Sequence, residues 1–278
     1  MPETCHPWRW ALAMELFGRY FAAPAAEVFP RIETTSWMVV VSGAERRIHG
    51  WSQAGLPAVV PPAFTARNPV AYGNTVCWDR IWKPEWPLDR EHVDQYYFHL
   101  LMREVSDDEA NADLYVPHTR CFPWVCRWCP DDENPKIPIM SRERYREVLR
   151  HLWLRGVDDM QVFNPKRVRF EDIAVQEVED AVIVYDEMLE YREFLDRGTV
   201  MCTDIPALQD EGVTWSGLRL DSRAVVRVLK QGGGAGEARV EAWPGHAIAL
   251  KATPAGQTYV LELRRGEIVV RSPKAEAR

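Results

Sequence analysis

The sequence predicts an α/β protein whose first domain is a TIM-type (β/α) barrel, incomplete, followed by a small antiparallel β-sandwich. Residues 1–205 alternate helical and strand patterns, with long segments after the strands, which is typical of a parallel α/β fold. Short β-rich segments recur about every ten residues after Asp210, separated by glycine and proline turns, and this pattern is typical of a sandwich. We therefore expect one domain at 1–205 and a second at 213–272.

The clearest helix-to-strand unit runs from Ser141 to Asn164. Ser141 is a good helix N-cap, and apolar residues recur behind it at spacings of three and four. Gly156 stands where a helix needs a left-handed residue to end. A short buried strand at 159–163 then stops at Asn164, because Pro165 cannot continue a central ladder.

Four strands are expected in the first domain, at 37–41, 69–73, 114–117 and 159–163. The helical patterns lie at 7–23, at 89–105, at 141–155 and around Val175, Val178, Val182, Tyr185 and Leu189. A closed barrel of this type needs eight strands. The sequence therefore predicts half to five-eighths of a barrel, with strand edges open to pairing with another chain.

The second domain is expected from six short segments with β composition. Turn signals such as Pro244-Gly245, Pro254-Ala255-Gly256 and Arg265-Gly266 separate several of them. So small a sheet must lean on the first domain to cover its second face. The segments are 213–220, 224–229, 238–243, 247–252, 258–263 and 267–271.

Composition and charge exclude several classes of partner. The formal net charge of −7 argues against binding of nucleic acid or of an anionic membrane. No apolar run has the length of a membrane span, and the first ten residues do not resemble a signal peptide. That segment resembles the inside of a helix, so we expect a truncated form of a longer protein and leave the localisation open.

The cysteines leave three alternatives open. Cys126 and Cys129 form a CxxC pair with Cys121 close ahead, which allows a zinc site, a disulfide or reduced thiols. A structural zinc needs a fourth ligand, and His118 is the one candidate nearby. We expect no metal and no cofactor.

The order of elements resembles the C-terminal part of (β/α)8-barrel glycoside hydrolases that carry an appended β-sandwich. The resemblance is closest over residues 114–164, where a strand ends in His118 and Arg120 and Arg155-Gly156-Val157 leads to a strand with a polar end. The terminal strands of hyaluronidase-like and amylase-like barrels are laid out similarly. The resemblance implies a carbohydrate substrate and carries no catalytic residue over by position.

The expected site lies at the carboxyl ends of the strands, where barrels of this type place their chemistry. Asp79 and Glu85 are the candidate catalytic carboxyls, because glycoside hydrolysis needs two and indole neighbours raise a carboxyl pKa. Indole faces also stack on sugar rings. The candidate substrate-binding residues are Trp78, Trp82, His118, Arg120, Trp124 and Asn164.

Each of these assignments has a structural alternative. Asp79 and Glu85 could form surface ion pairs with Arg80 and Lys83, while the tryptophans pack the loop. His118 and Arg120 could fix a loop, and Asn164 could be an Asn-Pro turn. The sequence therefore favours a carbohydrate hydrolase, with a lyase for uronic polysaccharides as a variant. A non-catalytic carbohydrate-binding or structural protein is the alternative.

Overall fold

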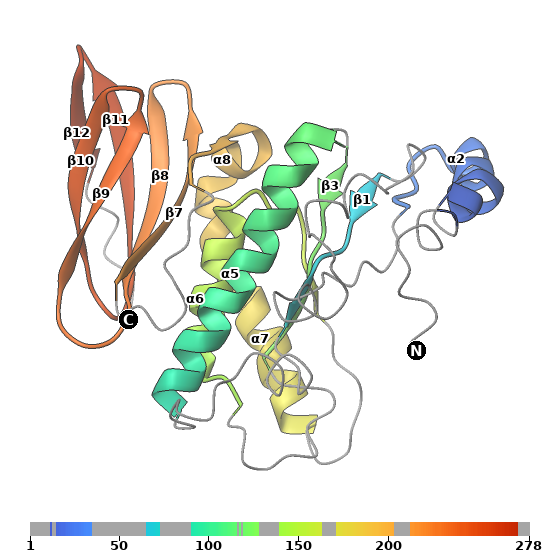
Figure 1. Ribbon diagram of the computed structural model, residues 1–278, viewed down its shortest axis with the longest axis horizontal. Helices are drawn as coiled ribbons and strands as arrows, with labels where there is room; N and C mark the ends of the chain where they lie inside the picture. The colour runs from blue at the N-terminus through green and yellow to red at the C-terminus, as the bar shows by residue number, and fades with distance from the viewer. Residues whose placement is uncertain are drawn as a thin grey trace.

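The computed structural model describes residues 12, 15–34, 65–72, 90–115, 117, 119–127, 139–162, 171–202 and 212–271. Its described part consists of an amino-terminal helical segment, short parallel strands packed with longer helices, and an antiparallel β region (Figure 1). The amino-terminal helical segment and the β region lie at opposite ends of the molecule.

The parallel part consists of two strand pairs that follow one another along the same two chain segments. β1 (Ala66–Arg67) pairs with β3 (Arg120–Cys121), and β2 (Val70–Tyr72) pairs with β4 (Trp124–Cys126). β4 also pairs in parallel with β5 (Gln161–Val162), which gives the order β2-β4-β5. These described strands do not close into a barrel, so the barrel stays a prediction.

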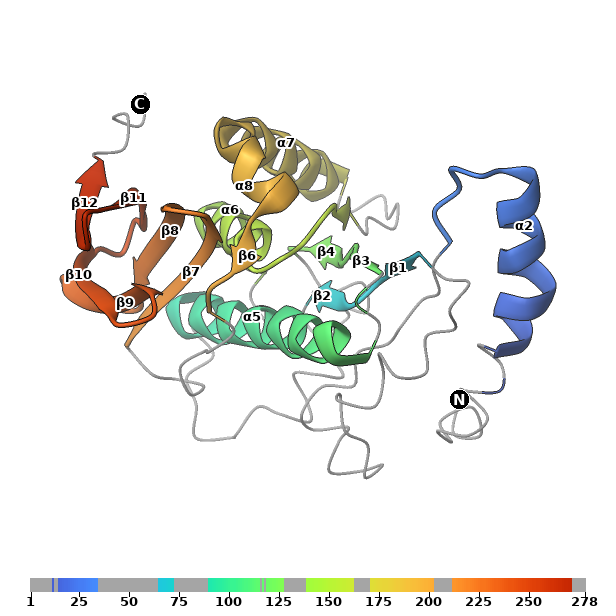
Figure 2. The same ribbon diagram turned by 90° about the horizontal axis from the view of Figure 1, so that it is seen from above.

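Long helices cover these strands on both sides. α5 and α7 lie on opposite sides of the short parallel strands, and α6 packs against both helices (Figure 2). The remaining helical elements are η1 and α2 near the amino terminus and η5 and α8 after α7. Their bounds are η1 Gly18–Ala22, α2 Ala23–Val28, α5 Arg90–Tyr115, α6 Arg142–Trp153, α7 Glu171–Met188, η5 Leu189–Tyr191 and α8 Arg192–Arg197.

α6 forms as the sequence predicts. The Ser141 hydroxyl accepts a hydrogen bond from Arg144 N and so caps the helix. Tyr145, Val148 and Leu152 are fully buried on its core side. Gly156 has a φ of +92°, and a Cβ there would lie 2.8 Å from Glu109 Oε1, so the position requires glycine for two reasons.

The predicted strand at 114–117 is wrong, because α5 continues through Tyr115. The run from Ser106 to Asp113 has no glycine or proline to stop a helix. Two of its polar residues find distant partners: Ser106 bonds to Arg155, and Asp108 bonds to Arg67. The parallel strands that pair with β1 and β2 are instead β3 and β4, in a stretch that the sequence analysis treats as a loop.

The β region forms a five-stranded antiparallel sheet and a hairpin. The sheet has the order β12-β11-β8-β7-β6, and the β9–β10 hairpin packs on it through a shared apolar cluster. All six predicted segments after residue 212 are strands. The bounds are β6 Thr199–Val200, β7 Val213–Leu220, β8 Arg223–Lys230, β9 Gly236–Trp243, β10 His246–Ala252, β11 Gln257–Arg264 and β12 Glu267–Arg271.

The sheet is buried on both faces, as β8 shows. Ala224, Val226 and Val228 contribute to the cluster under the hairpin, while Val225 and Leu229 belong to the main core with α5 and α6. This division follows the period of two along a strand. Residues from both predicted domains thus share one core, and β6, which precedes the predicted boundary, is part of the sheet.

Candidate functional site

The parallel register brings the carboxyl ends of three strands to one edge. Tyr72 lies opposite Cys126 in the β2–β4 pair, and Val125 lies opposite Val162 in the β4–β5 pair. Ligands of open α/β sheets bind outside this edge. Most of the predicted site residues follow Tyr72 or Val162 closely in the sequence.

A buried polar cluster stands at the end of β4, which we call the carboxyl-end cluster: Cys126, Arg127, Tyr145 and Glu177. Glu177 reaches in from α7 and accepts a hydrogen bond of 2.5 Å from Arg127 N. The same carboxylate oxygen lies 3.6 Å from the Cys126 thiol. Burial lowers the pKa of Arg127, and the nearby Glu177 acts against that shift.

Tyr145 completes this cluster from α6. Its hydroxyl is buried and finds no hydrogen-bond partner among the described residues. Burial raises the pKa of Tyr145 well above its usual value, and the carboxylate of Glu177 raises it further. A buried hydroxyl without a partner is unfavourable, so the cluster has a hydrogen-bonding group to offer.

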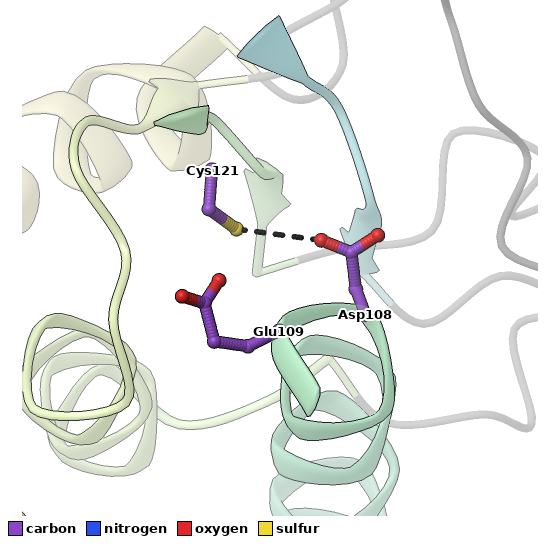
Figure 3. Close-up of side chains that lie close together, drawn as sticks. All are labelled: Asp108, Glu109 and Cys121. Carbon is purple, nitrogen blue, oxygen red and sulfur yellow. Dashed lines mark hydrogen bonds between the residues drawn. The ribbon is translucent and has the colours of Figure 1, made fainter. Parts of the chain in front are cut away.

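A second cluster lies at the amino ends of the same strands, shown in part in Figure 3. We call it the amino-end cluster: Arg67, Asp108, Glu109, Thr119 and Cys121. Arg67 donates to Asp108 at 2.9 Å, to Glu109 at 2.7 Å, and to the carbonyl and hydroxyl of Thr119 at 2.7 and 2.6 Å. Each carboxylate here has a cationic partner, which is what a stable buried charge requires.

The amino-end cluster has the residue types of a metal site, but its contacts do not suit one. Ligand atoms of Asp108, Glu109 and Cys121 lie within 4.8 Å of one another. Burial and the neighbouring Asp108 raise the pKa of the Cys121 thiol, whereas a metal needs the thiolate. Arg67 already forms an ion pair with each of the two carboxylates, so we interpret this group as a structural ion-pair cluster.

A third group of buried polar residues joins α6 to the β region. His151 Nδ1 lies 2.7 Å from Ser216 Oγ, and His151 Nε2 lies 3.2 Å from Glu147. Arg227 forms two bonds to Glu147, and Arg155 donates to Ser216 Oγ. Serine, histidine and glutamate recur in hydrolases, but here all three are buried and their atoms serve this network.

A pocket of about 300 Å³ lies beside this network, between the start of α6 and the turn at Pro254–Ala255. Three of the charged residues that line it are already engaged. Asp94 accepts from the Ser141 backbone, Glu147 is held by Arg227, and Arg150 binds Glu187. We therefore place the candidate site at the carboxyl-end edge.

Two of the predicted site residues are described, and both lie before that edge. Arg120 is the first residue of β3 and pairs with Glu33 at 3.0 Å. Trp124 is the first residue of β4, half-buried, and donates its indole N–H to Gln161 at 2.6 Å. The other predicted site residues lie outside the described part of the chain: Trp78, Asp79, Trp82, Glu85, His118 and Asn164.

The structure reduces the three alternatives for the cysteines, a zinc site, a disulfide or reduced thiols, at the two cysteines of this stretch that it describes. Cys121 and Cys126 are both free thiols. They are five residues apart along one extended segment, roughly 16 Å at the rise of a strand, which is too far for one disulfide or one zinc ion. Cys129 and His118 lie outside the described residues.

Sequence reasoning missed the residues of the carboxyl-end cluster because their role depends on tertiary contacts. Glu177 stands on the polar side of a helix whose apolar stripe is much more conspicuous. The pairing of Arg127 with α7 involves residues 50 positions apart. The one local signal was the CxxC pair, which marked Cys126 for a different reason.

No protein-family model matches the chain, and no curated protein or solved structure matches it either. None of the described helices combines the length and apolar character needed to cross a bilayer. The function is therefore argued from the site.

Proposed function

We propose that the chain binds an oligo- or polysaccharide at the carboxyl ends of β2, β4 and β5 and hydrolyses it by carboxylate acid/base chemistry. The observation that carries this proposal is the parallel register of Tyr72 with Cys126. It supports a site in which the segment after Tyr72, with its tryptophans and two acids, begins beside the carboxyl-end cluster.

The chemistry follows from the two carboxyls, Asp79 and Glu85. One donates a proton to the glycosidic oxygen as the bond to the sugar carbon breaks. The other either attacks that carbon or activates the water that does. Trp78 and Trp82 supply apolar area for stacking against sugar rings, and indole neighbours favour the protonated form of an adjacent acid.

The described residues supply the floor of this proposed site. Arg127 and Glu177 hold the end of β4 against α7, and the Tyr145 hydroxyl, which has no partner among the described residues, lies beside them. Asn164 would follow β5 at the same edge. Arg120 begins β3 and binds Glu33, so it is less suited to bind the substrate than the sequence suggests.

The test incubates the chain with a panel of polysaccharides: starch, cellulose, xylan, chitin and hyaluronan. Cleavage is measured as the release of reducing ends. We expect Asp79→Asn and Glu85→Gln to abolish turnover and leave the thermal midpoint unchanged, since an acid in a predicted loop contributes little stability. Trp78→Ala should raise KM more than it lowers kcat. Asp196→Asn and Glu237→Gln, two exposed carboxylates on α8 and β9, are the matched controls.

Full activity of both amide variants on a substrate that the parent cleaves would contradict the hydrolase proposal. Binding of a polysaccharide with no cleavage would favour the alternative, a non-catalytic carbohydrate-binding protein. New unsaturated ends on hyaluronan would indicate the lyase variant.

A further inference from the structure

The outer face of α7 and the start of η5 carry a continuous apolar stripe. Val175, Val178, Val182, Tyr185 and Leu189 follow one another at spacings of three, four, three and four. This is the a/d spacing of a coiled-coil seam. About half of the surface of Val175 and Val182 is exposed, at 54% and 53%. The stripe is therefore arranged like an interface, and no element of the described part of the chain covers it.

The inner face of α7 explains why the apolar stripe points outward. Asp180, fully buried, accepts hydrogen bonds from Arg142 and Arg146 of α6. Glu177, one turn earlier, accepts from Arg127 N. Turning the stripe inward would break these ion pairs and leave charges unpaired, which is costly. The packing of α7 thus fixes an exposed apolar face.

A second apolar face stands on the amino-terminal helical segment, residues 15–28. Leu16, Phe17, Tyr20 and Phe21 are exposed there, with Tyr20 at 70% and Phe21 at 66%. The rings of Phe17 and Phe21 stack at 5.1 Å and form one apolar surface. Figures 1 and 2 both show η1 and α2 at the edge of the molecule and apart from α7. The two faces therefore do not cover each other within one chain.

Length and area indicate how the two faces can be covered. The stripe spans 15 residues, about 22 Å at the rise of an α-helix, and the helical segment that carries the second face spans 14, about 21 Å, so the segment is long enough to lie along the stripe. At on the order of 80 Å² for each half-exposed large side chain, the nine side chains of one helix-to-helix contact bury roughly 700 Å² in total. Two reciprocal contacts reach roughly 1,400 Å², within the range of a standard stable interface.

Charge argues against pairing of α7 with another α7. The stripe is flanked by the exposed acids Asp172, Glu179, Asp186 and Glu190. Two such helices would bring like charges together. The amino-terminal segment carries Arg19 over the ring of Tyr20, together with Glu15 and Glu27, so its net charge of −1 repels this acidic border less than a second α7 would.

From these observations we infer that the chain forms a dimer in which the amino-terminal helix of each copy packs on the α7 stripe of the other. The exchange is reciprocal, so it closes with two-fold symmetry and covers both of these apolar faces in each copy. The carboxyl-end cluster lies under the inner face of the same helix, and the dimer therefore also braces Glu177.

The experiment measures the mass of the full chain by light scattering after gel filtration, over a wide range of concentration. One variant carries Val178→Asp and Val182→Asp, and a second carries Tyr20→Asp and Phe21→Asp. Each is expected to be monomeric with unchanged circular dichroism, because an unpaired charge is costly to bury. Val178→Ser with Val182→Ser replaces the first variant if the aspartates unfold it. Val269→Asp with Val270→Asp, two exposed valines on opposite faces of β12, is the control and remains dimeric.

Mixing the two monomeric variants distinguishes reciprocal exchange from other pairings. The copy with an altered α7 keeps its amino-terminal helix, and the other copy keeps its stripe, so one intact contact forms and a heterodimer appears. A parent chain that is monomeric at every concentration would overturn the inference. So would an amino-terminal variant that remains dimeric while the α7 variant dissociates, because α7 would then pair with itself.

Discussion

The amino-end and carboxyl-end clusters lie at opposite ends of the same parallel strands and differ in how completely they are paired. Arg67 satisfies Asp108, Glu109 and Thr119 at the amino end. At the carboxyl end, the buried hydroxyl of Tyr145 has no partner among the described residues. The difference teaches that the amino-end cluster is fully used in holding the fold together, whereas the candidate ligand-binding edge keeps one buried hydrogen-bonding group that the described residues do not use.

The largest effect on stability is expected at the amino-end cluster. Arg67→Met would leave the buried Asp108 without its cationic partner and should lower the free energy of unfolding by about 3–5 kcal/mol. Arg120→Met is the control, because its ion pair with Glu33 is exposed and should contribute about 1 kcal/mol or less. Urea unfolding compares the two variants. Equal losses would show that the amino-end cluster is not the structural core of the strands.

We expect the stability to depend on pH because of the third buried polar group, which joins α6 to the β region. Burial is the largest influence on the pKa of its histidine, His151. Burial lowers the pKa of His151 from 6.5 to about 4, so the unfolded chain takes up this proton at a higher pH than the folded one does. Stability is therefore complete above pH 6.5 and is lost as the pH falls towards 4, by about 3 kcal/mol.

Glu147 adds to this acid sensitivity at lower pH. Burial alone would raise the pKa of Glu147, but the charges and hydrogen bonds of Arg227 and His151 together outweigh burial and lower this pKa, so the contribution of Glu147 to stability is lost as the pH falls below 4.5. Urea unfolding between pH 4 and 7.5 measures the slope. His151→Gln, which does not titrate, should flatten the slope above pH 4.5, and an unchanged slope there would assign the effect to other groups.

The smallest effect on stability is expected at the carboxyl-end cluster. Tyr145→Phe removes a hydroxyl without a described partner, so it should change the free energy of unfolding by less than about 1 kcal/mol or even stabilise the fold. Tyr259→Phe is the matched control, because that hydroxyl donates to Lys251 O at 2.7 Å and should cost about 1 kcal/mol. A larger loss of unfolding free energy for Tyr145→Phe than for Tyr259→Phe would mean that the Tyr145 hydroxyl in the carboxyl-end cluster is hydrogen-bonded after all.

Local signals made part of the fold predictable. Ser141 and Gly156 mark the ends of the α6 unit by side chain and by backbone freedom alone, and both assignments are confirmed. The strands after residue 212 were also predictable, since glycine turns such as Gly245 and Gly266, both with positive φ, separate them. These features depend on neighbours in sequence.

The remaining features depend on contacts between distant residues. α5 runs past Val105 because Ser106 and Asp108 bond to Arg155 and Arg67, and nothing near them in sequence shows this. The stripe of α7 was visible, but its direction was set by Asp180 and the arginines of α6. For the same reason the sequence identified loop residues as the site and missed Glu177.

Binding to an array of immobilised glycans tests the central claim most directly, which is that the carboxyl-end edge of β2, β4 and β5 is the ligand-binding face. The account predicts that the chain binds at least one class of glycan and that Trp78→Ala and Trp82→Ala each abolish the signal. Arg120→Met, which alters the amino end of the strands, should retain it. Binding that survives both tryptophan changes but is lost with Arg120→Met would contradict the account, and so would a chain that binds no glycan on the array.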